Sequence, residues 1–294
     1  MGGAFARHLV AAGFTVGGYD LDPRRRADLK RRGGKPETSI AAIAGNHPVL
    51  MTSLPSVKAC EAVFFGAGGI LESAPRGTIV IETSTMPLAV KLGLRSRCAR
   101  RGIVVLDCPI SGTGAQAAAK DVAVYASGDR AAVKRCQSVF EGFARSMHYC
   151  GDYGNGSKLK FIANLLVTIH NLSAAEAIVL GRKSGLDLDL LYKVIRDGAG
   201  TSRMFEVRAP MMIADDYSKA TMKVDVYQKD IDIIGAFAAG LHCPTPLFDA
   251  SKQFYAAALS QGHALDDTAV LCAVLEQMAG IPRKRTTTRK KRKQ

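Results

Sequence analysis

The pattern of apolar and polar positions changes character near residue 154. Before that point, short apolar runs alternate with helical stretches, and polar residues follow most of the runs. We expect strands over 14–20, 49–54, 78–82, 103–107, 122–126 and 147–150, with helices between them over ranges such as 2–13, 87–101 and 130–143. Strands that alternate with helices predict a mostly parallel, doubly wound α/β sheet of the Rossmann type.

After Gly156 the pattern is typical of helices only. Helical periodicity runs through 158–183, 187–197, 203–214, 223–240, 246–261 and 266–279, with glycine and proline between the segments. The sequence therefore predicts an α/β domain over residues 1–153, an all-helical domain over 154–280 and a basic tail over 281–294.

The first helix after this change is the longest, and it is apolar nearly all round, which predicts a buried helix. Lys160 and Asn164 lie one helical turn apart on it, so their side chains share a face. Burial would lower the pKa of the lysine, which suits proton transfer near neutral pH. The alternative is a lysine that extends from the start of the helix to solvent. We expect this helix to join the two domains and to bring both residues to the crevice between them.

The N-terminus matches the second half of a dinucleotide-binding βαβ unit. A helix that begins with small residues ends at Gly13, and the run after it ends at Asp20. The first strand and two glycines of the G-x-G-x-x-G fingerprint are missing, so that only Gly2 is left to represent it. We therefore expect an N-terminally truncated binding domain, less stable and weaker in cofactor binding than one with the full fingerprint.

Asp20 is placed to accept hydrogen bonds from the adenosine ribose hydroxyls, which would favour NAD over NADP. The alternative is an ordinary carboxylate at the end of a strand. Arg24, Arg25 and Arg26 follow shortly afterwards. An arginine here can hold a 2′-phosphate, so NADP stays open as the second cofactor, unless these arginines only form the exposed side of the next helix.

Charge and cysteine content add three expectations. The net charge is +14, but residues 283–294 hold eight of the 40 basic groups and no acid, so the tail is expected to be disordered. Contact with nucleic acid, an anionic membrane or an import receptor is expected only through this tail, which can equally be a solvated extension. Seven scattered cysteines without a CxxC pair predict buried thiols in a reducing cytoplasm, and neither disulfides nor a zinc site. We expect no signal peptide and no membrane span.

Five motifs, taken in order, resemble those of the β-hydroxyacid dehydrogenase family, which includes 3-hydroxyisobutyrate and L-threonate dehydrogenases. The resemblance covers about residues 1–280, and the segment 197–206 is most similar to the L-threonate branch. The motifs are Ser53-Leu54-Pro55, Ser84-Thr85, Asp107-Cys108-Pro109-Ile110-Ser111-Gly112-Thr113, Gly156-x-x-x-Lys160-x-x-x-Asn164 and Lys229-Asp230. Two positions depart from the family pattern, Thr113 in place of glycine and Ala163 in place of asparagine.

The resemblance implies an oxidoreductase that transfers a hydride between NAD and a short hydroxy acid. Lys160 would then be the acid/base and Asn164 would orient the substrate hydroxyl. Ser111, Gly112 and Thr113 would hold the substrate carboxylate through backbone N–H groups and the Ser111 hydroxyl. The cofactor would contact Gly2, Asp20, Leu54, Pro55, Thr85 and Lys229. We expect no bound metal, and we expect the protein to form a homodimer or homotetramer.

A second hypothesis is a non-catalytic nucleotide- or chromatin-binding relative of the same family. The basic tail and the incomplete fingerprint favour it. The presence of Lys160, Asn164 and Ser111 favours the enzyme.

Overall fold

The computed structural model describes residues 1–282, which form two compact units. Unit 1 consists of Met1–Asn164 and Asp232–Cys243, and unit 2 of Leu165–Ile231 and the chain from Pro244 onward. The division falls inside two helices, α10 (Asn155–Lys183) and α13 (Val224–Gly240), and not at the start of α10 where the sequence pattern changes. The predicted basic tail, apart from its first two residues, lies outside the described residues.

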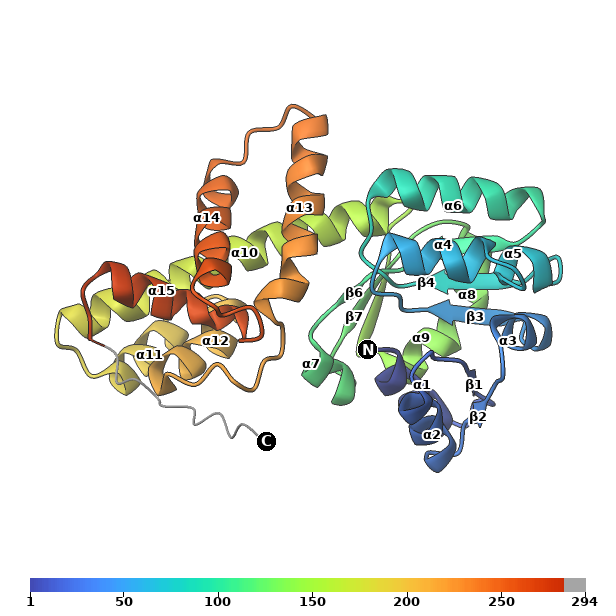
Figure 1. Ribbon diagram of the computed structural model, residues 1–294, viewed down its shortest axis with the longest axis horizontal. Helices are drawn as coiled ribbons and strands as arrows, with labels where there is room; N and C mark the ends of the chain where they lie inside the picture. Colours follow the sequence, from blue (N-terminus) through green and yellow to red (C-terminus); the bar gives the residue numbers. More distant parts are fainter. Residues whose placement is uncertain (283–294) are drawn as a thin grey trace, which may run out of the picture. The chain divides into compact units, whose positions relative to one another are not determined.

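Unit 1 contains all the strands of the described chain (Figure 1). They are β1 (Gly17–Gly18), β2 (Lys35–Pro36), β3 (Val49–Thr52), β4 (Ile79–Glu82), β5 (Val104–Asp107), β6 (Ile110–Ser111), β7 (Ala123–Ala126) and β8 (Ser146–Tyr149). Its helices before α10 are α1 (Gly2–Ala11), α2 (Pro23–Arg31), α3 (Ile40–Asn46), α4 (Val57–Phe65), α5 (Ile70–Ser73), α6 (Leu88–Arg100), α7 (Gly114–Ala118), α8 (Arg130–Arg135) and α9 (Gln137–Phe143).

The strands form three ladders: β1-β2, β3-β4-β5 and β6-β7-β8. All pairings are parallel except that of β6 with β7. The six predicted strands are all present, although β1 is much shorter than the run that predicted it. β2 and β6 were not predicted, because two residues are too few to show an alternating pattern. β1 and β3 belong to separate ladders.

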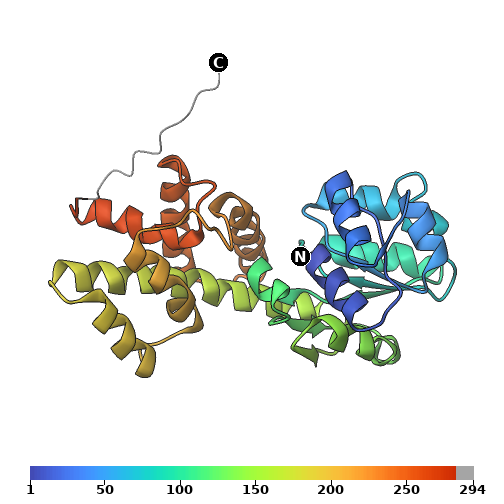
Figure 2. The ribbon, with the colours of Figure 1, turned by 90° about the horizontal axis from the view of Figure 1, so that it is seen from below.

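Apolar side chains on both faces of the strands explain why helices cover both sides. Ile79 and Ile81 of β4 belong to a core with α1, α7, α8 and α9, whereas Val80 between them packs in a second core with α3, α4, α5 and α6. Successive residues of a strand point to opposite faces, so one strand contributes to both cores. The helices of both layers can be followed in Figures 1 and 2. The prediction of a doubly wound, Rossmann-like α/β domain is thereby confirmed.

The helices of unit 1 differ from the prediction in two places. The helix expected over 130–143 is two helices, because the backbone at Cys136 has ψ of 7° and so leaves the α conformation. The short helix α7 was not predicted. It begins directly after the motif that ends at Thr113, and Thr113 is its N-cap residue.

Apart from an isolated bridge between Lys223 and Asp267, the regular secondary structure of unit 2 in its described residues is helical, as predicted. Besides parts of α10 and α13 it contains α11 (Leu188–Asp197), α12 (Arg203–Ala214), α14 (Pro246–Ser260), a 3₁₀ turn over Thr268–Val270 and α15 (Leu271–Met278). Buried polar groups join these helices. Asn171 of α10 donates hydrogen bonds to the Tyr255 hydroxyl at 3.1 Å and to the Thr268 carbonyl at 2.8 Å, and Arg208 pairs with the buried Asp267.

α10 is the one helix among the described residues with the length and apolar composition of a membrane span. This is weak evidence for a membrane, because the core helix of a soluble protein meets the same criterion. The absence of a membrane span therefore stays a prediction.

Candidate active site

The ends of the three central strands bring the predicted cofactor loops to one edge of unit 1. Thr52 pairs with Glu82, and Glu82 pairs with Asp107, so β3, β4 and β5 end at the same level. Leu54 and Pro55 lie in the loop that follows β3, and Thr85 lies in the loop that follows β4. The Leu54 N–H donates to the Ser84 hydroxyl at 2.8 Å, which ties the two loops together. The carboxyl edge of a parallel sheet is where such folds bind ligands.

The N-terminus of α1 lies beside the first of these loops, since a Cβ on Gly2 would lie 3.7 Å from the Cβ of Ser53. The N–H of Ala4 donates to the Met1 carbonyl at 2.8 Å, so the helical hydrogen bonds begin after Gly2 and Gly3. A Cβ on Gly3 would meet nothing within 4 Å. Open space at backbone N–H groups of a helix start fits a phosphate group. The residues present therefore fit the pyrophosphate of NAD(P).

Asp20 is exposed two residues after β1, where a ribose would bind. Its carboxylate accepts the N–H of Asp22 at 2.9 Å, and its carbonyl accepts a hydrogen bond from the Arg26 guanidinium. Arg24 pairs with Asp22 at 2.9 Å. Two of the three arginines are thus paired with neighbouring groups. Arg25 is exposed, as Arg24 is, and burial together with the charge of Arg25 lowers the pKa of the Met1 α-amino group.

The predicted substrate loop crosses from β6 to α7. Gly112 has φ of +139°, and a Cβ there would lie 2.8 Å from Val122, so the turn requires glycine. The Thr113 hydroxyl accepts the Gln116 N–H at 3.3 Å, and the Thr113 N–H donates to the Gln116 side chain at 3.0 Å. This capping box means that the Thr113 N–H is already used within the chain. Among the described residues, the Ser111 hydroxyl has no hydrogen-bond partner, and it stays available together with the Thr113 hydroxyl proton.

Lys160 and Asn164 lie in the part of α10 that belongs to unit 1 and are 9% and 6% exposed. The face of Lys160 and Asn164 is therefore buried. The prediction of a helix buried nearly all round is wrong, because Leu159, Ile162 and Leu166 in this helix are 44%, 54% and 46% exposed. Phe161, next to Lys160, packs against Phe237 of α13 with 5.2 Å between the ring centroids. The start of α10 lies against the strand that leads to the substrate loop, because a Cβ on Gly156 would lie 2.8 Å from the carbonyl of Asp107.

Lys229, the remaining candidate, belongs to unit 2. It forms an ion pair with the adjacent Asp230 at 3.2 Å, and its side chain is 39% exposed. The other ten candidates lie in unit 1.

A buried ion cluster, which the sequence pattern did not predict, lies at the ends of β4 and β5. The Lys91 ammonium, 1% exposed, lies 2.7 Å from Glu82 Oε2 and 2.6 Å from Asp107 Oδ1. Burial by itself lowers the pKa of Lys91, but the two carboxylates outweigh it and raise that pKa above the ordinary value for lysine. Lys91 shares one face of α6 with the buried Leu94 and Cys98. A lysine at a core position of an amphipathic helix was the signal that could have revealed the cluster.

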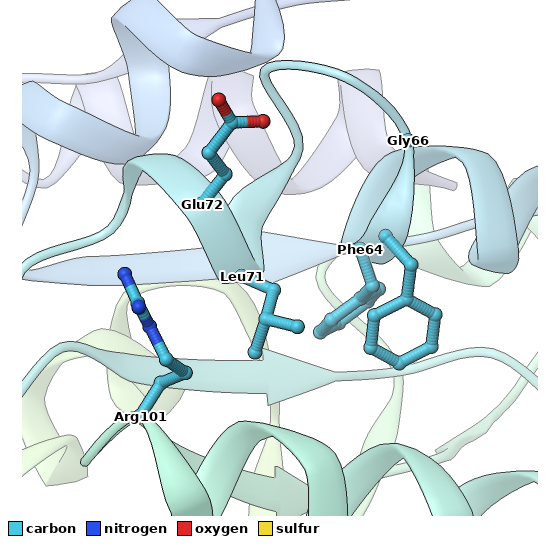
Figure 3. Close-up of a pocket in the computed structure, with 6 residues that line it drawn as sticks. Phe64, Gly66, Leu71, Glu72 and Arg101 are labelled. Atoms are coloured by element: carbon cyan, nitrogen blue, oxygen red, sulfur yellow. The ribbon is translucent and has the colours of Figure 1, made fainter.

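A shallow hollow of about 240 Å³ lies elsewhere, beside the C-terminal ends of α4 and α6 (Figure 3). Phe64, Leu71 and Arg101 are among its lining residues. Because α4 and α6 start at the carboxyl edge of the strands and run back, their C-terminal ends lie at the amino edge. This hollow is therefore separate from the candidate site.

Comparison with known proteins agrees with this geometry. Residues 1–151 match the NAD-binding domain of 6-phosphogluconate dehydrogenase, and residues 154–275 match the NAD-binding family of NADP-dependent 3-hydroxyisobutyrate dehydrogenase. The chain is 36% identical to an L-threonate dehydrogenase of Cupriavidus necator, over 92% of each chain. It is 31% identical to an L-threonate dehydrogenase of Pectobacterium atrosepticum, over 92% of this chain and 90% of the other.

A crystal structure of 3-hydroxyisobutyrate dehydrogenase from Salmonella typhimurium has the same fold. The TM-score is 0.84 at 29% identity, with 93% of this chain and 95% of that chain covered. Both halves of the chain and its nearly full-length relatives lead to one assignment: the chain belongs to the NAD(P)-dependent β-hydroxyacid dehydrogenase family.

Proposed function

We propose that this protein oxidises a short-chain hydroxy acid of the L-threonate or 3-hydroxyisobutyrate type, with Lys160 as the acid/base and NAD as the preferred cofactor. The observation that carries the proposal is the buried pair Lys160 and Asn164, one turn apart on α10, whose first turn contacts the strand leading to Ser111. The L-threonate dehydrogenases that the chain resembles support L-threonate, the more polar of these hydroxy acids, as the first substrate to test.

NAD(P), when bound, supplies the hydride acceptor. The hydroxyl-bearing carbon of the substrate would give up a hydride to this acceptor and so be oxidised to a carbonyl carbon. Lys160, as the neutral amine, accepts the hydroxyl proton in the same step and returns it when the reaction runs toward reduction. Asn164 donates its amide N–H to the substrate oxygen, which keeps that oxygen within reach of Lys160. The low exposure of both side chains limits competition from water.

The substrate carboxylate binds at the turn after β6. The Ser111 hydroxyl, the Gly112 N–H and the Thr113 hydroxyl are the donors that this turn offers. Since the capping box uses the Thr113 N–H, Thr113 contributes through its side chain and not through the backbone nest first expected. At the α1 end, Gly2 would bind the pyrophosphate and Asp20 the ribose, with Leu54, Pro55 and Thr85 as the further cofactor contacts of unit 1.

The test compares Lys160→Ala with wild type on L-threonate, 3-hydroxyisobutyrate and L-serine. NAD reduction is followed by its absorbance at roughly millimolar substrate. Loss of the acid/base lowers kcat by roughly 10²–10⁴-fold while NAD binding survives. Lys158→Ala is the matched control, because Lys158 is exposed and lies two positions earlier on the same helix. Equal turnover by Lys160→Ala and wild type would refute the assignment.

Two further parts of the proposal concern the whole protein. A homodimer or homotetramer is supported by exposed apolar side chains such as Leu186, Leu190 and Val194, which are 56–59% exposed at helical spacing in and before α11. Light scattering that shows a monomer at micromolar concentration would contradict it. A cytoplasmic location is supported by the seven cysteines, which are all free thiols. Five of them are buried as predicted, whereas Cys150 is partly buried and Cys243 is exposed.

A further inference from the structure

The buried Lys91 cluster has a second set of contacts, which reach both sides of the candidate site. Glu82 ends β4 and Asp107 ends β5, and the two residues are paired in register. Lys91 bridges their carboxylates from α6 at 2.7 and 2.6 Å. All three side chains are at most 1% exposed. A charge triad so far from solvent is costly unless each group has specific partners.

Each carboxylate also holds a segment outside the cluster. Glu82 Oε1 accepts the N–H of Ser84 at 2.9 Å and so fixes the loop that continues to Thr85. Asp107 Oδ2 accepts the N–H of Ser157 at 2.8 Å, and its Oδ1 accepts the Ser157 hydroxyl at 2.8 Å. Ser157 lies in the first turn of α10, where N–H groups have no partner within the helix. Asp107 thus binds the start of α10 as a negatively charged cap.

Other contacts make this attachment tight. The N–H of Gly156 donates to the Ser127 hydroxyl at 3.0 Å, and that hydroxyl donates to the carbonyl of Asp107 at 3.1 Å. A Cβ on Gly156 would collide with the carbonyl of Tyr125. Lys160 comes three residues after Ser157 in a continuous helix, so a fixed Ser157 also fixes the backbone position from which the Lys160 side chain extends.

We propose that Lys91, Glu82 and Asp107 form a positioning cluster that sets the place of Lys160, through Ser157, relative to the Ser84–Thr85 loop. The inference rests on the proposed function, because Lys160 and Thr85 have the roles given above. The cluster touches neither reactant. The Lys91 ammonium binds both carboxylates. Glu82 fixes the Ser84–Thr85 loop, and Asp107 caps the start of α10, the helix that carries Lys160.

Ser157→Ala removes one contact of this arrangement without leaving a buried charge unpaired. The variant loses the hydroxyl bond to Asp107 but keeps the backbone bond and the ion cluster. The expected result is a kcat about tenfold lower, with KM for NAD changed less than about twofold. Hydrogen exchange in a peptide covering residues 155–164 becomes faster, because the first turn of α10 is less firmly held.

Ser39→Ala is the matched control. The Ser39 hydroxyl caps α3 in the same unit by accepting the Ala42 N–H at 3.1 Å, so its loss also removes one serine hydrogen bond at a helix start. We expect wild-type kcat and wild-type exchange over 155–164 in this variant. If the control loses as much kcat as Ser157→Ala, the effect is general destabilisation and the inference is wrong. Unchanged kcat in Ser157→Ala also overturns it.

The two proposals fail in different ways. If wild type reduces NAD with none of the hydroxy acids, the proposed function fails, and the exchange measurement alone decides the inference about α10. Exchange over 155–164 that is the same in Ser157→Ala and wild type then overturns it. If wild type is active and Ser157→Ala has the same kcat and the same hydrogen exchange as wild type, the proposed function stands and the positioning role is wrong.

Discussion

Replacing Lys91 with methionine is the perturbation for which the structure makes the strongest stability prediction. Methionine is nearly as long as lysine and is apolar, so it fills the space on α6 but supplies no positive charge. Glu82 and Asp107 are then left as two carboxylates at adjacent strand ends, each essentially without solvent exposure. Removal of one partner from a buried ion pair leaves uncompensated charge in a region of low dielectric.

The expected loss follows from this burial. Breaking a buried pair on one side costs about 3–5 kcal/mol, and no discount for solvent screening applies, because Lys91 is 1% exposed. The total free energy of unfolding of a protein is about 5–15 kcal/mol, so Lys91→Met removes a large fraction of it. With a urea dependence of about 2 kcal/mol per molar, the unfolding midpoint falls by roughly 2 M.

Urea titrations followed by circular dichroism measure this shift, since the chain has no tryptophan for fluorescence. Lys252→Met is the matched control, because Lys252 pairs with an exposed Asp249 at 2.6 Å on the surface of α14. We expect no resolvable change in midpoint there. The triple variant with Lys91→Met, Glu82→Gln and Asp107→Asn removes the charges together and recovers much of the loss. A small effect of Lys91→Met, or no recovery in the triple variant, would refute the electrostatic reasoning.

Three further predictions concern pH, packing and the cofactor. The folded state raises the pKa of Lys91. The charged Lys91 therefore contributes its full stabilisation below the ordinary lysine pKa of about 10.4, and this stabilisation is lost as pH rises through the higher pKa of the folded state. The urea midpoint of wild type should fall as pH rises above about 10.4, and the midpoint of Lys91→Met should lack this part of the fall. Gly156→Ala should lower the free energy of unfolding by about 1–3 kcal/mol, whereas Gly93→Ala in α6, with nothing within 4 Å of its Cβ, should raise it by about 0.5–1 kcal/mol in the same titration. Asp20→Ala should lower the ratio of kcat/KM for NAD to that for NADP by roughly tenfold, or about 1.4 kcal/mol, and a wild-type preference for NADP would disprove the role given to Asp20.

Much of the architecture could be predicted because each element carries its own periodic signal. The apolar runs that became β3, β4 and β5, and the 3.6-residue period of α10 to α14, reflect burial that repeats along the chain itself. The motif residues Ser111, Lys160 and Asn164 were found for a related reason, since their spacing is local. The limits of this approach lie at short elements. β2 and β6 contain two residues each, and their existence depends on the partner strand and not on their own pattern.

The tertiary structure decided which polar groups act on one another. Nothing local connects Lys91 with Glu82 or Asp107, or Asp107 with Ser157 50 residues later, because these contacts exist only once the parallel strands end in register and α10 begins beside them. The same holds for Thr113, which the sequence marked as a departure from glycine and the fold uses as a helix cap. The sequence by itself thus determined the elements, the family motifs and the candidate acid/base, since these depend on residue type and spacing along the chain. The buried cluster that holds them in place required the fold, since pairing of buried charges depends on distances between segments far apart in sequence.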